Sequence, residues 1–389
     1  MYEKKTEPIY TEARDAGNTF RAKYLQSVHD LVKKKQAESQ AKRDAFGANI
    51  SENRELYRQK YREMLGWPLN TEPEPIRSVE ETLIHEDDNC LIWRVQLEVF
   101  EDFQFYGIRM IHKTEEKLPY VIVQHGGAGT SEIVTSFFDS ANYNDMALRV
   151  FNKGVNVFMP QLLLWAMPDF GEDFLKSEED WGRDCRHRYD AALHQLGGSI
   201  TALEIYCISR VLDYLEQKPE FNGAFGMAGL SYGGFYTHYT VAAEPRIRAA
   251  LSCGQFNDRI KYNWSDWTWF NAANTFLDAE VCALICPNYL RIETGREDPL
   301  FDWKTAEAEY ERLRRYYREA EENLHFKVFD GNHEFCVDED SVAEFVDAVK
   351  TLVNGQNTYV WQGWIPLPCC FGPQKVKNQF FCGCATGFS

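Results

Sequence analysis

The chain has 389 residues, 44% of them hydrophobic, and a formal net charge of −17. This length and apolar content allow one large α/β domain with additions, or two ordinary domains, and argue against a disordered chain. The acidic balance argues against nucleic acid or an anionic membrane as a partner, because a phosphate-binding surface needs clustered Lys and Arg.

The cysteine pattern and the N-terminal sequence bear on the cellular compartment. The first ten residues, M-Y-E-K-K-T-E-P-I-Y, hold no apolar segment typical of a signal peptide, and no run of 18 apolar residues occurs. Eleven cysteines are present, an odd number, and several stand alone in predicted strands and helices, as Cys90, Cys207 and Cys253 do. Such cysteines suit reduced core thiols better than disulfides, so we expect a cytoplasmic protein.

Residues 1–75 are rich in Lys, Arg, Glu and Gln, and apolar residues recur at helical spacing at Tyr57, Tyr61 and Leu65. This pattern predicts a helical N-terminal arm packed on the main domain. Its mixed charges suit a solvated helix face, and the alternative is a contact in a homo-oligomer. Two prolines within 71–75 mark the expected boundary with a main domain over 76–354.

Strand and helix patterns alternate through the main domain. Strands are expected within 92–112 (two), and over 120–124, 154–160, 225–230, 247–253, 289–293 and 326–329, with a closing amphipathic helix over 342–352. A T-x-x-E match at Thr201 and Glu204 predicts a capping box at the start of another helix. The alternation predicts an α/β fold whose mostly parallel central sheet is covered by helices on both faces.

Three segments do not fit the simple alternation. The connections over 161–198 and 254–276 are longer than ordinary loops and leave predicted carboxyl ends of strands, where open α/β sheets bind ligands, so we expect cap-like insertions. Residues 355–389 hold no Asp or Glu and four of the cysteines, in the pattern C-C-x11-C-x-C. That spacing matches no strong zinc pattern, so we expect a loosely ordered C-terminal extension without a metal.

The stretch over 225–235 reads F-G-M-A-G-L-S-Y-G-G-F and contains G-x-S-x-G around Ser231. An apolar run precedes the serine and a helical run follows it, which is the strand-turn-helix context of a nucleophile elbow. Glycine is needed on both sides because the turn is sharp and a Cβ would crowd the neighbouring strand or helix. The pattern also occurs by chance, so the interpretation requires a base, an acid and an oxyanion hole elsewhere.

An acid and a histidine each follow a later predicted strand. We expect Asp298 to hold the imidazole of His333 in the correct tautomer, and His333 to take the proton of Ser231 and return it to the leaving alcohol. Glu297 and Asp302 flank Asp298 as competing acids. A residue directly before proline is held extended, which favours Asp298.

The oxyanion hole needs two backbone N–H groups, which we assign to Gly127 and Tyr232. Tyr232 follows the nucleophile, and Gly127 lies in the run H-G-G-A-G after the strand over 120–124. The glycines would let the backbone approach the substrate oxygen, or would form a tight turn with no catalytic part. His125, which begins the run, is expected to be structural or to face the substrate.

With these residues the chain resembles the α/β-hydrolase superfamily and, within it, serine esterases such as acetyl xylan esterases, cephalosporin C deacetylases and dienelactone-hydrolase-like proteins. The resemblance covers about 80–353 and rests on 125–127, 229–234, 295–299 and 331–334. It implies the α/β-hydrolase fold and a serine carboxylic-ester hydrolase that acts on a small-molecule ester through an acyl-enzyme, without metal or organic cofactor. Dienelactone hydrolases proper use Cys where this chain has Ser231, which disfavours that activity. A serine peptidase of the same fold and a non-catalytic binding protein are the alternatives.

The insertion over 254–276 offers a hint about the substrate, because it is unusually rich in aromatic residues: Tyr262, Trp264, Trp267, Trp269 and Phe270. Together with Trp165 these rings are expected to form an aromatic wall beside Ser231 that stacks on a sugar ring or encloses an apolar group. Alternatively, they only pack the loop onto the domain. Asp258, Asn263 and Asp266 could hydrogen-bond hydroxyls, which favours an acylated carbohydrate over a plain lipid ester.

Overall fold

The computed structural model describes residues 8–127, 129–163 and 185–352. Within these ranges no helix is both long enough and apolar enough to cross a bilayer. Trp165 and the predicted C-terminal extension over 355–389 lie outside the described residues.

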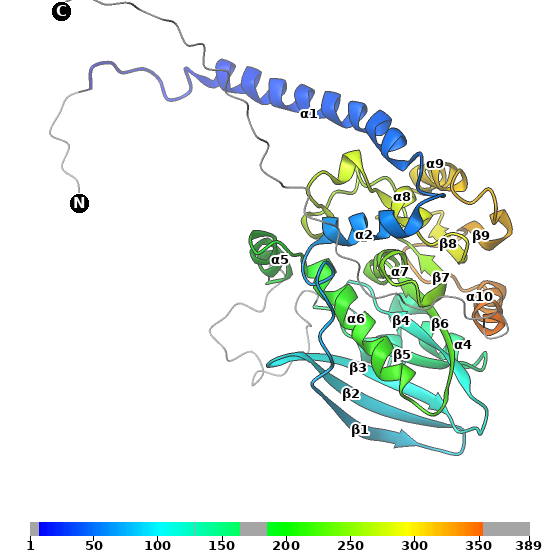
Figure 1. The fold of residues 1–389 in the computed structure, drawn as a ribbon. Helices are drawn as coiled ribbons and strands as arrows, with labels where there is room; N and C mark the ends of the chain where they lie inside the picture. Colours follow the sequence, from blue (N-terminus) through cyan, green and yellow to red (C-terminus); the bar gives the residue numbers. More distant parts are fainter. Residues whose placement is uncertain (1–7, 128, 164–184, 353–389) are drawn as a thin grey trace, which may run out of the picture. The chain divides into compact units, whose positions relative to one another are not determined.

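Nine strands form one sheet in the order β1-β2-β3-β5-β4-β6-β7-β8-β9 (Figure 1). Their bounds are Ser78–Glu86, Cys90–Phe100, Phe103–His112, Leu118–Gln124, Asn156–Pro160, Phe221–Leu230, Ile247–Cys253, Tyr289–Gly295 and Leu324–Phe329, for β1 to β9. The pairs β1/β2, β2/β3 and β3/β5 are antiparallel, and every pair from β5 to β9 is parallel. The mostly parallel sheet expected from the sequence is confirmed.

Helices cover both faces of this sheet. One face carries α2 (Arg54–Leu65), α6 (Ile200–Glu216), α7 (Tyr232–Ala243), α8 (Asp278–Ala283) and α9 (Trp303–Arg314); the other carries α4 (Met146–Phe151) and α10 (Glu339–Thr351). Successive residues of a strand point to opposite faces, so Met227 of β6 joins one hydrophobic core and Ala228 joins the other. Three further helices are α1 (Asn18–Gly47), α3 (Ser131–Val134) and α5 (Cys185–Gln195).

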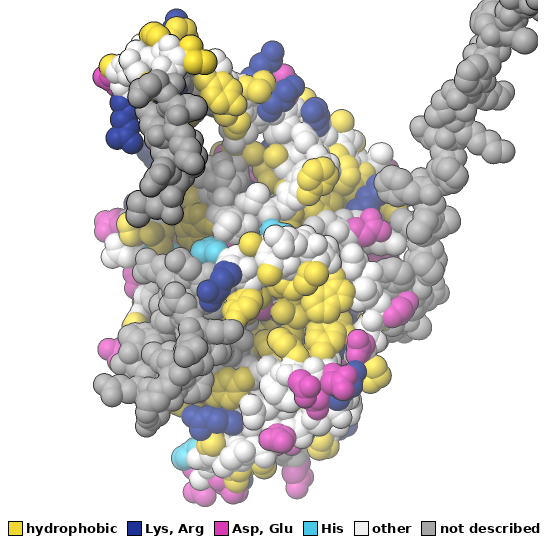
Figure 2. All heavy atoms as spheres, turned by 90° about the vertical axis from the view of Figure 1, so that its left-hand side faces the viewer, with side chains coloured by type: hydrophobic (Ala, Val, Ile, Leu, Met, Phe, Trp, Pro, Cys, Tyr) yellow, Lys and Arg dark blue, Asp and Glu magenta, His cyan; other side chains and the backbone are white. Residues whose placement is uncertain are grey.

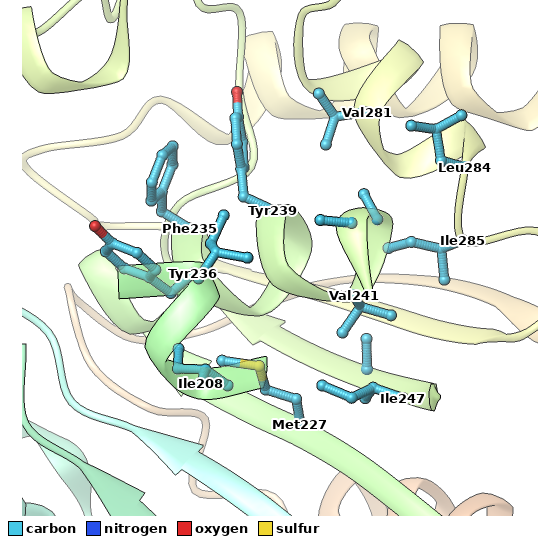
Figure 3. Packing of buried hydrophobic residues seen from close by; sticks show 14 of the residues in the cluster. Ile208, Met227, Phe235, Tyr236, Tyr239, Val241, Ile247, Val281, Leu284 and Ile285 are labelled. Atoms are coloured by element: carbon cyan, nitrogen blue, oxygen red, sulfur yellow. The ribbon is translucent and has the colours of Figure 1, made fainter. Parts of the chain in front are cut away.

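The helix α7, which follows the predicted elbow, is buried at all twelve positions. Figure 3 shows its side chains packed between Val281 of α8 on one side and Ile208 of α6 and Met227 of β6 on the other. A helix that is buried on every side lies in the interior of a large domain. The residue at its N-terminus is therefore attached to a rigid part of the core.

The helix α2 shows how the N-terminal arm joins the domain. Its residues Tyr57, Tyr61 and Leu65 are buried, as their spacing predicts. Arg58 Nε donates to the Ala242 carbonyl at 2.9 Å, one of the last α7 carbonyls, which lack partners within the helix. The arm thus binds the C-terminal end of the elbow helix.

The helix α1 is different, because its first half has little contact with the body. Near its C-terminal end Arg43 Nη1 donates to the Ala273 carbonyl at 2.6 Å. Exposed apolar side chains follow one side of the remaining turns: Phe20, Tyr24, Leu25, Val28, Leu31 and Val32. Figure 1 shows α1 running outward as a single long helix, and Figure 2, viewed towards its N-terminal end, shows hydrophobic and basic side chains together there.

Some sequence-based expectations were wrong in detail. The predicted capping box does not begin α6: Ser199 is the N-cap, and its hydroxyl accepts the Ala202 N–H at 3.0 Å. Thr201 and Glu204 lie inside the helix and bind other segments. The strand β1 was missed because most of its residues are exposed, which removes the alternation of apolar and polar residues.

Candidate active site

Ser231 occupies a sharp turn between β6 and α7. Its backbone has φ 61° and ψ −121°, in a region that is strained for a residue with a side chain. Glycines make the turn feasible: a Cβ on Gly229 would lie 2.3 Å from the Gly233 carbonyl carbon, and one on Gly233 would lie 2.0 Å from Gln124 O. The Ser231 N–H donates to the Cys253 carbonyl at 2.9 Å, which fixes the turn to β7. The expected nucleophile elbow is present.

His333 and Asp298 are in contact on the loops that follow β9 and β8. The distance from His333 Nδ1 to Asp298 Oδ2 is 2.8 Å. The other oxygen of Asp298 accepts the N–H groups of Leu300 at 2.7 Å and Phe301 at 3.0 Å. The Asp298 side chain is fully buried and the His333 side chain is 15% exposed. With Nδ1 bound to the carboxylate, Nε2 is the ring nitrogen left to exchange a proton.

The competing acids have other positions. Asp302 is the N-cap of α9, where its carboxylate accepts the Lys304 N–H at 3.0 Å. Glu297 is exposed. Neither is seen bound to His333, so the geometry favours Asp298 as the partner of the imidazole.

The elbow, the glycine run and the histidine loop meet at the carboxyl ends of neighbouring strands. A Cβ on Gly126 would lie 2.9 Å from Ser231 Cβ, and one on Gly254 would lie 3.4 Å from the His333 ring. Gly127 is half-buried, and among the described residues no group accepts its N–H. Tyr232 begins α7, so its N–H belongs to the first turn, where the helix dipole favours negative charge. Gly127 and Tyr232 therefore flank the serine from two sides.

Known structures share this arrangement of strands and helices. A methylesterase, BT1017, is 16% identical with a TM-score of 0.57, and the match covers 77% of this chain and 64% of the other, less than two thirds of that protein's length. A Bacteroides fragilis protein provisionally assigned as an acetyl xylan esterase is 12% identical with a TM-score of 0.58, covering 79% and 84%. A glucuronoyl esterase from Solibacter usitatus is 11% identical with a TM-score of 0.54, covering 77% and 92%. No family model and no curated protein matches the sequence.

The chain has the α/β-hydrolase fold. In this fold the nucleophile stands at the elbow, and the acid and histidine follow it in chain order. Ser231, Asp298 and His333 occupy those places here.

The aromatic insertion divides into core and surface residues. Trp267 and Trp269 are buried and stack on Phe235 of α7, with ring centroids at 4.7 and 6.2 Å. Their expected role as substrate contacts is therefore wrong, because both rings are covered by the domain. Trp264 is 37% exposed, and its ring lies 5.8 Å from that of Tyr232.

Trp264 is connected to His333 through one further ring. Its centroid lies 5.9 Å from that of Phe301, which in turn lies 5.7 Å from the His333 ring. Trp264 is thus the one predicted tryptophan in the described ranges that combines exposure with a place beside the elbow. Trp165 lies outside those ranges.

His125 is buried and bound to neighbouring backbone, which favours the structural one of its two expected roles. Its side chain is fully buried, with Nε2 accepting the Leu162 N–H at 3.0 Å and Nδ1 lying 2.9 Å from the Gly126 carbonyl. Burial lowers its pKa to about 4. The ring is therefore neutral at pH 7 and holds the start of the glycine run against the segment after β5.

A buried ionic cluster behind the elbow was missed by sequence reasoning. Arg186 is fully buried, with Nε 2.6 Å from Asp266 and Nη1 2.9 Å from Glu204. Burial alone would lower the pKa of Arg186, but these carboxylates raise it well above the usual range, so it stays charged. The Tyr232 hydroxyl lies 3.1 Å from Asp266 Oδ2. Asp266 is therefore committed to the cluster, and its expected contact with a substrate hydroxyl is wrong.

Potential metal ligands gather at another place. Within the described ranges His85, Asp87 and Cys90 form a group whose ligand atoms lie within 4.8 Å of one another. They lie at the β1–β2 turn, at the opposite edge of the sheet from β8 and β9. Asp87 Oδ1 already accepts the Asn89 and Cys90 N–H groups at 2.7 and 2.8 Å, which accounts for the carboxylate within the turn.

Proposed function

We propose that this chain hydrolyses carboxylic esters through an acyl-enzyme on Ser231. The observation that carries the proposal is the 2.8 Å contact between His333 and Asp298, on loops that bring the imidazole beside the strained serine turn. A serine hydroxyl is a weak nucleophile until a base takes its proton, and an imidazole held by a buried carboxylate is such a base.

The steps balance for an ester and one water. Ser231 Oγ attacks the carbonyl carbon while His333 Nε2 takes the hydroxyl proton, and the oxyanion is held by the N–H groups of Gly127 and Tyr232. The C–O bond to the alcohol breaks, and His333 returns the proton to the leaving oxygen. Water then attacks the acyl-enzyme with His333 again as base, which releases the acid and restores Ser231.

An acylated carbohydrate is the proposed substrate class. Trp264 offers a half-exposed aromatic face near His333, and such faces stack on sugar rings. Solved structures with this fold include proteins named as a methylesterase and a glucuronoyl esterase. No metal or organic cofactor is required by the proposed steps.

We also propose a cytoplasmic protein that forms homo-oligomers through α1. The six described cysteines whose burial is known are all free and buried, which supports a reducing compartment. The α1 helix carries seven Lys and Arg and three Asp and Glu, so its net charge is +4. Because the whole chain has a net charge of −17, the rest of the chain has a net charge of −21. Its basic, partly apolar surface is complementary in charge to the acidic body of a second copy. The same acidic total supports neither nucleic acid nor an anionic membrane as a partner.

The test combines labelling with turnover. The wild-type protein should react with a fluorophosphonate probe at Ser231, located by mass spectrometry, and should hydrolyse acetylated oligosaccharides. Ser231→Ala should remain folded, lose the label and lose at least about 10³-fold in kcat. A folded wild type that neither labels nor turns over esters would instead favour a binding protein, and residual activity within tenfold in Ser231→Ala would contradict the elbow assignment.

A further inference from the structure

The loop between α3 and α4 contacts both halves of the proposed catalytic site. Asn142, Tyr143 and Asn144 are consecutive residues, and the first two belong to the short helix η1 (Ala141–Tyr143). They lie about 190 residues before the His333 loop in sequence, and Tyr143 follows Gly126 of the glycine run by 17 residues. Neither a motif nor a composition signal marks them.

The two asparagines hold the histidine loop. Asn142 Nδ2 donates to the His333 carbonyl at 2.9 Å, and the Asn142 carbonyl accepts the Phe335 N–H at 2.9 Å. Asn144 Nδ2 donates to the Phe335 carbonyl at 2.7 Å and to Glu334 Oε2 at 3.0 Å. The backbone that leaves His333 on its C-terminal side, as far as Phe335, is thereby fixed by one short segment.

Tyr143 holds the glycine run. Its hydroxyl accepts the Gly126 N–H at 2.8 Å, and its side chain is buried in the core. A Cβ on Gly129 would lie 2.1 Å from this hydroxyl. Gly126 and Gly129 are therefore needed for the approach of Tyr143 and the elbow, whereas Gly127 is the member of the run left for the substrate oxygen.

The segment keeps a costly backbone conformation. Asn144 has φ 48° and ψ 48°, and Asp145 has φ 55° and ψ 33°, both in the left-handed region. Asn and Asp tolerate this region better than most residues, but it still costs free energy and persists where surrounding contacts require it. The left-handed turn directs Asn144 back to the histidine loop while Tyr143 points to the glycine run.

We propose that Asn142, Tyr143 and Asn144 are positioning residues that hold the oxyanion loop and the histidine loop in register with each other. The inference rests on the proposed function and adds to it a coupling between the two loops. The bond from the Gly126 N–H to Tyr143 fixes the His125–Gly126 peptide plane, and the Gly126 carbonyl accepts the Gly129 N–H at 3.1 Å in the following plane, which also carries the Gly127 N–H. Tyr143 thereby anchors the start of the turn that directs the Gly127 N–H to the oxyanion formed when His333 deprotonates Ser231.

The test compares two tyrosine substitutions of the same chemistry. Tyr143→Phe keeps the ring but removes the acceptor of the Gly126 N–H. Tyr206→Phe is the matched control, because the buried Tyr206 hydroxyl accepts the Glu74 N–H at 2.7 Å and its ring stacks on Phe100, away from the catalytic loops. Both variants should lose similar stability, measured by urea unfolding.

Only Tyr143→Phe should slow catalysis. We expect its kcat to fall about 10- to 100-fold with KM within about twofold, since a misdirected oxyanion donor weakens binding of the transition state alone. Fluorophosphonate labelling of Ser231 should slow by a similar factor. In the double variant Asn142→Ala/Tyr143→Phe, the fold-loss in kcat should be much smaller than the product of the fold-losses of the two single variants, because each change uncouples the same two loops.

Failure of the inference and failure of the proposed function give different results. If wild-type Ser231 is not labelled, the proposed function fails. If wild type is labelled and Tyr143→Phe matches Tyr206→Phe in kcat and labelling rate, the positioning role alone is refuted. Independent, multiplicative losses in the double variant would likewise overturn the coupling.

Discussion

The contact between Asp298 and His333 gives the sharpest prediction. In Asp298→Asn the single amide oxygen can replace only one carboxylate oxygen. The Oδ1 position already accepts two backbone N–H groups, from Leu300 and Phe301. An NH₂ group placed there would face two donors, so the amide oxygen takes that position and the NH₂ faces His333.

This orientation reverses the tautomer of the imidazole. An NH₂ group 2.8 Å from Nδ1 requires Nδ1 to accept, which leaves the proton on Nε2, the atom that must take the proton of Ser231. An inverted tautomer of this kind costs about 10⁴-fold in rate, or about 5.4 kcal/mol in the activation barrier. Because both backbone N–H groups keep an acceptor, the unfolding midpoint should stay within about 3 °C of wild type.

The assay is kcat/KM for an aryl acetate at pH 7, with Asp302→Asn as the matched control. Asn is as good an N-cap as Asp, and the ion pair of Asp302 with Lys261 is exposed and 3.4 Å long, so activity should stay within about threefold. A loss below tenfold in a folded Asp298→Asn would refute the reasoning. So would a larger loss in Asp302→Asn.

Three further predictions concern the substrate, acid stability and the arm. Trp264→Ala should change the ratio of kcat/KM for an acetylated sugar to that for an aryl acetate by more than twofold, about 0.4 kcal/mol. The core change Trp269→Ala, whose ring packs on Phe235 and Tyr239, should cost about 3 to 5 kcal/mol of stability and leave this ratio unchanged. If Trp264→Ala leaves the ratio as unchanged as Trp269→Ala does, Trp264 does not contact the sugar. Burial lowers the pKa of His238 to about 4 in the folded protein, compared with about 6.5 in the unfolded chain, so the neutral ring's contribution to stability is complete above pH 6.5 and about 2 to 3 kcal/mol of it is lost by pH 4.5. In urea unfolding, the free energy of unfolding of His238→Gln should therefore fall less steeply between pH 6.5 and 4.5 than that of wild type. An equal fall in both proteins would contradict a neutral buried ring. Leu31→Glu on α1 should lower the mass measured by light scattering without changing kcat, and a monomeric wild type would exclude the proposed oligomer.

The sequence allowed the arrangement of Ser231, Asp298 and His333 to be predicted because each residue is marked by its neighbours. Ser231 stands between glycines that the turn requires, and Asp298 and His333 each follow a predicted strand, which the structure shows as β8 and β9. Parallel strands end at one edge of the sheet, so residues that follow them are brought together whatever their separation in the chain. The predicted contact between Asp298 and His333 is present for this reason.

The surroundings of the site could not be predicted in the same way. Composition places aromatic rings on a loop but does not say which side of the loop meets the core, so Trp267 and Trp269 were assigned to the substrate although they pack on α7. Arg186 and Tyr143 act through contacts with residues distant in the sequence, which no local pattern records. The prediction of a capping box at Thr201 was wrong because Ser199, two residues before Thr201, is the N-cap of α6.

The contacts of α2 have a consequence for biosynthesis. Its Arg58 binds the carbonyls of Ala242 and Leu284, 184 and 226 residues further along the chain. On the ribosome this helix is made before its partners, which do not exist until much of the sheet has been synthesised. The tyrosines that α2 buries in the folded protein therefore remain exposed to solvent during translation, and in this state they can associate with other nascent chains. We expect this protein to depend on chaperones in this interval more than a protein in which no helix docks so long after its synthesis.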